Sequence, residues 1–191
     1  MRLFVALEIP ADVREALGEL IGELRPLCQG AHWARPQGMH VTLKFIGHAI
    51  EGPESEKWAS LRAALAAIQS SEPLALQFRG IGFFPQARRP RVVWCGIQAS
   101  ANLARLAGDL DRALARLGIP AEQRDFTPHL TLARFRSPAG TEALVRACEQ
   151  VASRDFGSVR ATQFHLLESI LKASGAEYKR LETYTFVKER A

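Results

Sequence analysis

The order of strands and helices runs twice along the 191-residue chain, and this duplication limits the folds that are open to it. Short β-branched and aromatic runs are typical of strands, and apolar residues every three or four positions are typical of helices. In the first half they alternate over residues 2–9, 11–27, 40–47, 56–69 and 74–84. The second half repeats this strand, helix, strand, helix, strand order over residues 91–97, 100–118, 128–136, 141–152 and 162–171, and adds a strand at 178–187. The chain is therefore predicted to contain two copies of one structural unit.

The two copies align when the chain is shifted against itself by 89 residues without a gap. Residues 3–5 then fall on residues 92–94, and Phe78 in the third strand falls on Leu167. A shift that keeps strands on strands supports one ancestral β-α-β-α-β unit.

The repeat predicts how the chain is divided. We expect one catalytic domain of two lobes over residues 1–191, with the copies covering about 1–84 and 91–187. The segment FPQARRPR between them is rich in proline and arginine, which favours a loop, and it is the expected crossover between the halves.

Composition places the chain among soluble globular proteins, with 47% apolar and 24% charged residues. The net charge of +5 favours anionic partners such as nucleic acid or nucleotides. The three cysteines, Cys28, Cys95 and Cys148, have no CxxC spacing, so neither a disulfide framework nor a cysteine zinc site is expected. The apolar N-terminal run ends at Glu8 and Pro10, and no stretch approaches the roughly 18 apolar residues of a membrane span. We expect a cytoplasmic protein.

The tetrapeptides HVTL and HLTL occupy the same place in the two copies, at residues 40–43 and 129–132. Successive side chains of a strand point to opposite faces, so His40 and Thr42 share a face, as do His129 and Thr131. If the copies pack about an approximate two-fold axis, the four side chains meet in one cleft with a histidine on each side.

Paired imidazoles suit proton transfer near pH 7, because one ring can be neutral while the other is protonated. The threonine hydroxyls can donate hydrogen bonds to phosphoryl oxygens, whose charge changes in the transition state. This combination favours in-line displacement at phosphorus without a metal. The alternative is a His-x-Thr pair that is repeated only because the ancestor packed it in its core, but polar side chains are poor core material unless they are hydrogen-bonded.

Several blocks of the sequence resemble the two-histidine phosphoesterase superfamily. They are the two HxTL motifs, the opening RLFVALEIP, and the blocks FTPHLTLAR and LLESILKASGAEY. The resemblance covers nearly the whole chain and points to the bacterial and archaeal RNA 2′,3′-cyclic phosphodiesterases, also called 2′-5′ RNA ligases. It implies an α+β fold of two lobes, in which duplicated β-α-β-α-β units turn their antiparallel sheets toward a central cleft and carry their helices outside.

The resemblance also implies the reaction and the roles of the motif residues. A terminal 2′,3′-cyclic phosphate on RNA would be opened to a 2′-phosphate without a metal or cofactor. His40 would be the proton donor to the departing 3′ oxygen, and His129 the proton acceptor that deprotonates water. Thr42 and Thr131 would hold the phosphate. Run backward with an RNA 5′-hydroxyl in place of water, the same groups would give ATP-independent 2′-5′ ligation.

The longer second motif of the family, HxTxxR, is met by Arg134, whose guanidinium can bind phosphate oxygens through two parallel hydrogen bonds. In a regular strand residue 134 faces away from His129 and Thr131, so a bulge or the strand end must bring it into the cleft. Lys44 shares the parity of His40 and points either into the cleft or, as is commoner for lysine, into solvent.

Aromatic and basic residues near the motif strands fit a single-stranded RNA end, since such proteins stack bases on aromatic rings and follow the backbone with arginines. The candidates are Trp33, Arg35, Arg79, Phe84, Arg88, Arg89, Arg91, Arg124 and Phe126. The remaining histidines, His32, His48 and His165, lie outside the motifs, and the apolar strand around His165 favours a packed side chain.

The expected partner is RNA with a 2′,3′-cyclic phosphate end, with tRNA-derived RNA among the candidates, and the chain is expected to act as a monomer away from membranes. Two other functions stay open. One is the same chemistry on a small nucleotide, such as a cyclic phosphate of an ADP-ribose-like product. The other is a module that holds an RNA end without turnover, against which the intact histidines of both motifs argue.

Overall fold

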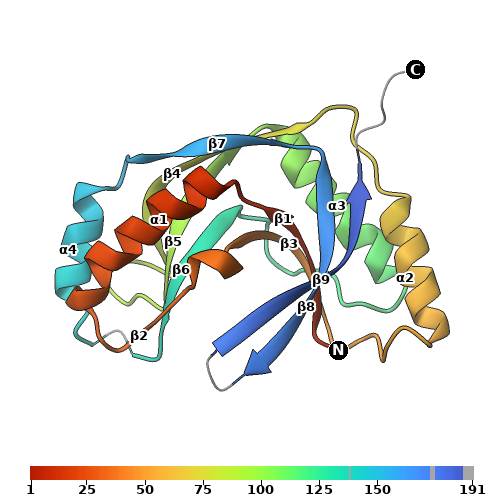
Figure 1. The fold of residues 1–191 in the computed structure, drawn as a ribbon, viewed down its shortest axis with the longest axis horizontal. Helices are drawn as coiled ribbons and strands as arrows, with labels where there is room; N and C mark the ends of the chain where they lie inside the picture. Colours follow the sequence, from red (N-terminus) through yellow and green to blue (C-terminus); the bar gives the residue numbers. More distant parts are fainter. Residues whose placement is uncertain (138, 173–174, 187–191) are drawn as a thin grey trace.

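The computed structural model describes residues 1–137, 139–172 and 175–186. The described chain forms two antiparallel sheets and four α-helices, arranged as two lobes (Figure 1). In chain order the elements are β1 (Leu3–Glu8), α1 (Ala11–Leu24), η1 (Arg25–Leu27), β2 (Ala31–Trp33), η2 (Pro36–Gly38), β3 (His40–Gly47), α2 (Glu56–Ala66), β4 (Leu74–Phe84), β5 (Val92–Ala99), α3 (Ala101–Ala115), β6 (His129–Phe135), α4 (Glu142–Gln150), β7 (Asp155–Ala161), β8 (Gln163–Lys172) and β9 (Gly175–Thr185). Residue 187, where the last predicted strand and the second predicted repeat end, lies outside the described residues, as do residues 173 and 174 of the block LLESILKASGAEY.

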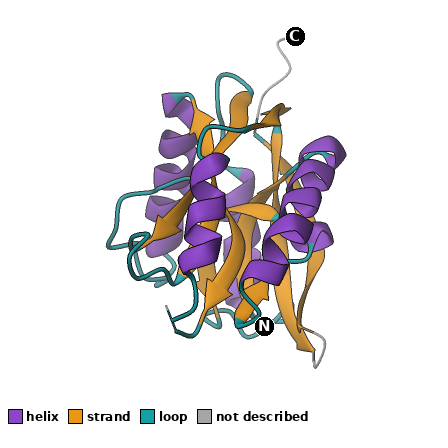
Figure 2. Ribbon diagram, turned by 90° about the vertical axis from the view of Figure 1, so that its left-hand side faces the viewer, coloured by secondary structure: helices purple, strands orange, loops and turns teal. Residues whose placement is uncertain are grey.

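Each lobe is one sheet with two covering helices. The four-stranded lobe has the strand order β3-β1-β8-β9 and carries α2 and α3, whereas the five-stranded lobe has the order β2-β6-β5-β4-β7 and carries α1 and α4. Figure 2 looks onto the helices that cover the five-stranded sheet. This is the predicted α+β architecture. No helix in the described part of the chain combines the length and the apolar character needed to span a bilayer.

Both lobes contain elements from both halves of the chain. The first-half strand β4 pairs with β5, and the second-half strand β8 pairs with β1. The helices α1 and α3 are exchanged in the same way, each packing on the lobe that its preceding strand does not belong to. The halves are therefore interlocked, and neither sheet can form from one half alone.

Because β4 belongs to the five-stranded sheet, the segment FPQARRPR connects two strands of the same sheet. Because β4 and β5 are antiparallel neighbours, this segment is a hairpin loop within the five-stranded sheet, closed by a 2.7 Å hydrogen bond from the Arg91 N–H to the Phe84 carbonyl. The segment does join the two halves of the chain, as expected, but it does not pass from one lobe to the other, since the third strand of the first half already lies in the five-stranded sheet.

Strand pairing shows which residues of the two lobes are equivalent. Ala6 pairs with Thr42 in one sheet and Trp94 pairs with Thr131 in the other, so the first strands are offset by 88 residues. Ala6 and Trp94 also pair with the third strand of each sheet, on β8 and β4 respectively. Comparing these two partners gives an offset of 83 residues for the third strands. Of these three pairs of strands, the motif strands alone keep the shift of 89 residues. A slip of one residue matters, because it exchanges the two faces of a strand.

One hydrophobic core runs through both lobes. Its contribution from α1 follows the predicted helical stripe and comprises Val13, Leu17, Leu20, Ile21 and Leu24. β1 is buried on both faces, with its odd-numbered residues in the main core and Phe4 and Ala6 in a smaller cluster with Leu167. Because burying one such side chain contributes about 1.5–3 kcal/mol, the shared core holds both walls of the cleft in place.

Two strands, β2 and β7, were not predicted. Both lie at edges of the five-stranded sheet, and most of their side chains are exposed or partly exposed. An edge strand of this kind carries glycine and polar residues, as in the sequence DFGSVRA of β7, so the apolar signal of a buried strand is missing.

Stability is expected to fall as the pH drops below about 6.5, because burial lowers the pKa of both His40 and His165 below that value. The unfolded chain then binds more protons than the folded chain, so the free energy of unfolding decreases toward acid. The His165 ring is 1% exposed, and its Nδ1 lies 2.9 Å from Thr183 Oγ1 and its Nε2 3.7 Å from a Glu8 carboxylate oxygen. Urea unfolding at pH 7.5 and 5.0 should show a smaller difference in His165→Gln than in the wild type. The exposed His48 provides a control, since His48→Gln should keep the wild-type difference. An unaltered difference in His165→Gln contradicts the assignment.

Candidate active site

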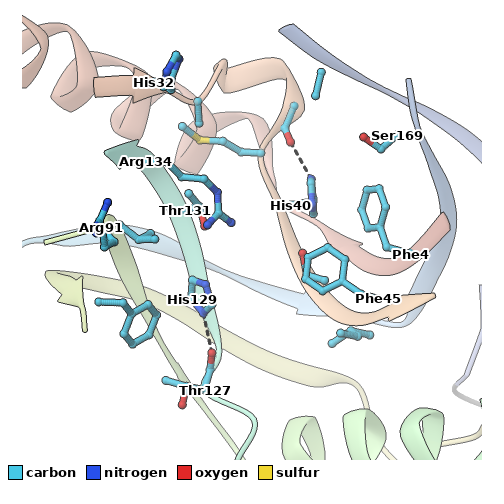
Figure 3. Close-up of a pocket in the computed structure, with 18 of the residues that line it drawn as sticks. Phe4, His32, His40, Phe45, Arg91, Thr127, His129, Thr131, Arg134 and Ser169 are labelled. Carbon is cyan, nitrogen blue, oxygen red and sulfur yellow. Dashed lines mark hydrogen bonds between the residues drawn. The ribbon is translucent and has the colours of Figure 1, made fainter. Parts of the chain in front are cut away.

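The two motif strands, β3 and β6, lie against each other where the lobes meet. Each begins at its histidine and alternates in the same way, with the histidine and threonine partly exposed and the leucine after each threonine buried. His40, Thr42, His129 and Thr131 all line one cleft. Figure 3 shows the two imidazoles on opposite walls of that cleft. The structure thus brings together the four side chains that the motifs single out.

Both imidazoles are held at Nδ1 by a backbone carbonyl two residues earlier. Nδ1 lies 2.8 Å from Gly38 O in His40 and 2.7 Å from Thr127 O in His129 (Figure 3). Because a carbonyl oxygen only accepts hydrogen bonds, Nδ1 carries the hydrogen in both rings. Proton exchange is left to Nε2, which is an acceptor in the neutral ring and a donor in the protonated ring.

A β-bulge brings Arg134 into the cleft. Along β6, Ala133 pairs with Val93 but Thr131 pairs with Trp94, so one extra residue lies between them and the later side chains exchange faces. Arg134 is consequently exposed on the cleft side and lines the cleft with Thr131 (Figure 3). The bulge that its predicted role requires is present.

β3 has the same bulge, at the equivalent place. Phe45 therefore occupies the position of Arg134 and lines the cleft with its side chain 53% exposed. Where the second lobe offers a cation to the cleft, the first offers an aromatic ring.

The two histidines have different surroundings. The His40 ring contacts Phe4 at a centroid distance of 4.7 Å and meets the edge of Tyr178 at 4.8 Å. Burial among these rings lowers the pKa of His40, and the hydrogen bond to Gly38 opposes this effect only in part. His129 meets the Phe84 ring at 5.0 Å, edge to face. The free protein therefore holds His40 mainly neutral at pH 7, and a bound anion beside it would favour its protonated form.

The phosphate-binding candidates have free donors. In the part of the chain that the structure describes, the side chains of Thr42, Thr131 and Arg134 have no hydrogen-bond or ion-pair partner. Two hydroxyls and one guanidinium thus line the same cleft as the imidazoles. That set matches the oxygens of a phosphodiester.

Lys44 borders the cleft but does not point into solvent, and its ammonium group is directed at α3 and at the segment before β6. Its side chain is 1% exposed, and Nζ donates to Asp111 Oδ1 and to Pro120 O, both at 2.6 Å. Asp111 Oδ1 also accepts from the Glu122 N–H at 3.0 Å, and although burial works the other way, these two donors keep the pKa of Asp111 below its usual value. Strict alternation along the strand placed Lys44 on the same face as His40. The bulge between Thr42 and Lys44 turns Lys44 to the other face.

The cleft is large, with a volume of about 2570 Å³. Small-molecule sites usually have roughly 300–1,000 Å³, so this space exceeds the needs of one nucleotide. Of the predicted RNA-contacting residues, those that line it are Trp33, Arg35, Phe84, Arg91, Arg124 and Phe126. Arg79, Arg88 and Arg89 lie outside it.

Sequence reasoning missed three aromatic residues of the cleft: Phe4, Phe45 and Tyr178. Phe4 and Tyr178 lie in the blocks RLFVALEIP and LLESILKASGAEY, which carried the family resemblance without a role for either residue. Phe45 could have been found from the repeat, because it lies 89 residues before Arg134 and therefore at the equivalent position of the first copy.

In the described chain no three histidine, cysteine or acidic side chains are placed to share a metal ion. His165 is buried in β8, as its apolar strand predicted, and His48 is exposed. His32 pairs with Arg134 on β6 and lies at the rim of the cleft (Figure 3).

The comparison with protein families decides what kind of chain this is. The profile of the 2′-5′ RNA ligase superfamily matches residues 9–171. The chain belongs to the 2′-5′ RNA ligase superfamily. Among curated superfamily proteins named RNA 2′,3′-cyclic phosphodiesterase, that of Archaeoglobus fulgidus is 34% identical over 185 residues, which cover 96% of this chain and 99% of the relative. That of Thermus thermophilus is 34% identical over 194 residues, covering 97% and 90%.

Solved structures of the superfamily share the fold. A protein of Thermus thermophilus matches with a TM-score of 0.79 and 32% identity over 100% of both chains. Escherichia coli LigT complexed with 3′-AMP matches with a TM-score of 0.78 and 27% identity over 98% of both chains. The predicted family and the predicted two-lobed α+β fold are confirmed.

Proposed function

We propose that residues 1–191 form one catalytic domain of two lobes that hydrolyses the 2′,3′-cyclic phosphate end of RNA to a 2′-phosphomonoester. The observation that carries the proposal is the pair of imidazoles on opposite walls of one cleft, each anchored through Nδ1 and each beside a threonine. The name of the curated relatives supports the choice of substrate. We assign the activity to a monomer in the cytoplasm, without metal or cofactor.

The proposed step uses one histidine on each side of phosphorus. His129 Nε2 takes a proton from water, whose oxygen forms a bond to phosphorus in line with the departing 3′ oxygen. The bond between phosphorus and O3′ breaks, and His40 Nε2 gives that oxygen a proton. The 2′ ester stays intact, so the product carries a 2′-phosphate and a free 3′-hydroxyl. The same step with an RNA 5′-hydroxyl in place of water as the nucleophile would form a bond from phosphorus to O5′, break the bond to O3′ and join two RNAs through a 2′-5′ linkage.

Arg134 is expected to contribute about two orders of magnitude to kcat/KM. With Thr42 and Thr131 it would bind the non-bridging oxygens as their charge changes, and removing one such donor costs about 10²–10³ in rate. Kinetics of Arg134→Ala on cyclic-phosphate RNA should show this loss, with partial recovery in Arg134→Lys, which keeps the charge but not the planar pair of donors. Arg116, exposed at the end of α3, offers a control, and Arg116→Ala should react like the wild type. A wild-type rate in Arg134→Ala rules out phosphate binding by this side chain.

The size of the cleft favours RNA over a small nucleotide, because the volume of about 2570 Å³ leaves space beside the terminal nucleotide. A mononucleotide fills only part of such a site. The oligonucleotide should therefore be the better substrate in kcat/KM.

The decisive experiment uses synthetic RNA that ends in a 2′,3′-cyclic phosphate, with EDTA in the buffer. We expect hydrolysis and a 2′-phosphate product, identified by chromatography against 2′- and 3′-phosphate standards. A 3′-phosphate product or full inhibition by EDTA contradicts the mechanism. Faster turnover of a mononucleotide cyclic phosphate would favour the small-nucleotide function, and tight binding without product over hours would favour an RNA-end-binding module. Adding a 5′-hydroxyl RNA tests ligation.

A further inference from the structure

Exposed apolar side chains gather at the outer end of the four-stranded sheet. Leu171 on β8 is 71% exposed, Tyr178 on β9 is 40% exposed, and Phe45 on β3 is 53% exposed. Most large apolar side chains of the described chain are buried, so a group of exposed ones marks a contact surface. In Figure 1 the hairpin of β8 and β9 extends beyond the rest of the sheet.

Strand pairing shows which of these side chains face the cleft. Ser169 pairs with Tyr178, and Leu171 pairs with Ala176. Paired residues in an antiparallel sheet share a face. Because Ser169, Ala176 and Tyr178 line the cleft, Leu171 belongs to the same face. Ile170, between them in sequence, points to the opposite face with 37% exposure.

A cation lies beside this apolar face. The Ser169 N–H donates to the Arg2 carbonyl at 2.8 Å, which continues the row of Ser169 and Tyr178 onto β1. Arg2 shares the parity of Phe4, the residue that contacts His40, and it lines the cleft. Within the described residues its guanidinium has no acidic partner. We call Arg2, Ser169, Leu171, Ala176 and Tyr178 the hairpin strip. An aromatic ring beside an arginine, here Tyr178 beside Arg2, is the usual composition of a single-stranded RNA site.

The proposed reaction decides on which side of the phosphate the RNA lies, and the inference rests on it. In-line attack places water on the side of His129 and the departing O3′ on the side of His40. The ribose that carries O3′ therefore lies toward the four-stranded lobe. From there, the Tyr178 ring that contacts His40 begins the hairpin strip.

We propose that the hairpin strip binds the nucleotides that precede the cyclic-phosphate end of the RNA. Tyr178 and Ala176 are two residues apart on one strand, which corresponds to about 7 Å. Stacked bases are about 3.4 Å apart, so the apolar rows have room for about two bases. Arg2 contacts a phosphate of the same segment. The site thus selects RNA ends over mononucleotides.

The test compares a mononucleotide 2′,3′-cyclic phosphate with a tetranucleotide that has the same 3′ end. The measured quantity is kcat/KM for the tetranucleotide divided by kcat/KM for the mononucleotide. This ratio should fall about fivefold in Leu171→Ser, which is the lower end of what a base gains by stacking on a protein side chain. Ile170→Ser is the matched control, since it makes the same change on the other face of the hairpin, and it should keep the wild-type ratio. In Arg2→Gln the slope of log KM for the tetranucleotide against log salt should become smaller by about 0.7.

Binding provides a readout that does not depend on turnover. Fluorescence anisotropy with a tetranucleotide that ends in a 2′-phosphate should show weaker binding in Leu171→Ser and wild-type binding in Ile170→Ser. If the wild type hydrolyses neither substrate, the proposed function fails, while this binding comparison still decides on the strip. A wild-type ratio and wild-type binding in Leu171→Ser overturn the proposal. So does an equal loss on both substrates, which would show that the hairpin supports the cleft and not the RNA.

Discussion

Alanine at either His40 or His129 is expected to lower the single-turnover rate on cyclic-phosphate RNA by about three orders of magnitude. General acid and general base catalysis each contribute about 10²–10⁴, and both histidines act in one step. The double variant should therefore be about as slow as either single variant. Rapid-quench kinetics at saturating enzyme measure the rates, and circular dichroism shows whether the fold is kept. Losses that multiply in the double variant would mean that the two rings do not act as a unit.

A second substrate separates the acid from the base. An aryl phosphodiester with a 4-nitrophenolate leaving group needs no proton on departure, so His40→Ala should lose much less activity on it than on RNA. His129→Ala should lose as much as on RNA, because water still has to be deprotonated. The opposite pattern would exchange the two roles and, with them, the side of the cleft on which the RNA lies.

A symmetric scaffold supplies two equal histidines, and their surroundings make them unequal. Both rings have the same anchor at Nδ1, so the anchor cannot distinguish a donor from an acceptor. The residues after the two bulges do differ between the lobes, because one position holds Phe45 and the other Arg134. Apolar surroundings lower the pKa of His40, which makes its protonated form a stronger acid. Arg134 adds a phosphate-binding cation on the His129 side of the cleft, where the first lobe has only the Phe45 ring.

The parts of the site that follow from local sequence could be predicted. The alternation of a strand places His40 with Thr42 and His129 with Thr131, and the repeat places the two pairs in equivalent strands. Family resemblance added Arg134, and the rule that a strand alternates showed that it needed a bulge. The bulge itself has no local signal in the sequence, and the same rule gave the wrong face for Lys44.

The parts that depend on long-range pairing could not be predicted. Exchange of β4 and β8 between the halves is set by the pairing of whole strands, for which a repeat pattern carries no information. Tyr178 reaches His40 only because β9 is added beyond β8 at the edge of the four-stranded sheet. The edge strands β2 and β7 lack the burial that creates an apolar pattern.

Lys44 joins the two motif strands in a way that neither reading of its sequence position suggested. It lies on the strand of His40, and it holds Asp111 on α3 and Pro120 in the segment that leads to β6. The residues of that segment are mostly exposed, so the hydrogen bond from the buried lysine is one of its few contacts with the protein interior. It ends at Thr127, whose carbonyl orients His129. Lys44 thus holds the start of the segment whose end carries the Thr127 carbonyl.

Replacing Lys44 by methionine is expected to lower the free energy of unfolding by about 2–3 kcal/mol. Removing one partner of a fully buried ion pair costs about 3–5 kcal/mol, and the side chain of Asp111 keeps 23% exposure, which lets water solvate part of its charge. Urea unfolding measures the loss, and Lys57→Met on the exposed side of α2 should stay within about 0.5 kcal/mol of the wild type. Replacing Asp111 by leucine together with Lys44→Met removes the stranded carboxylate and should recover part of the loss. If Lys44 also positions His129, kcat for cyclic-phosphate RNA will fall in Lys44→Met at temperatures where the protein is fully folded, whereas a stability loss with wild-type kcat would confine the lysine to folding.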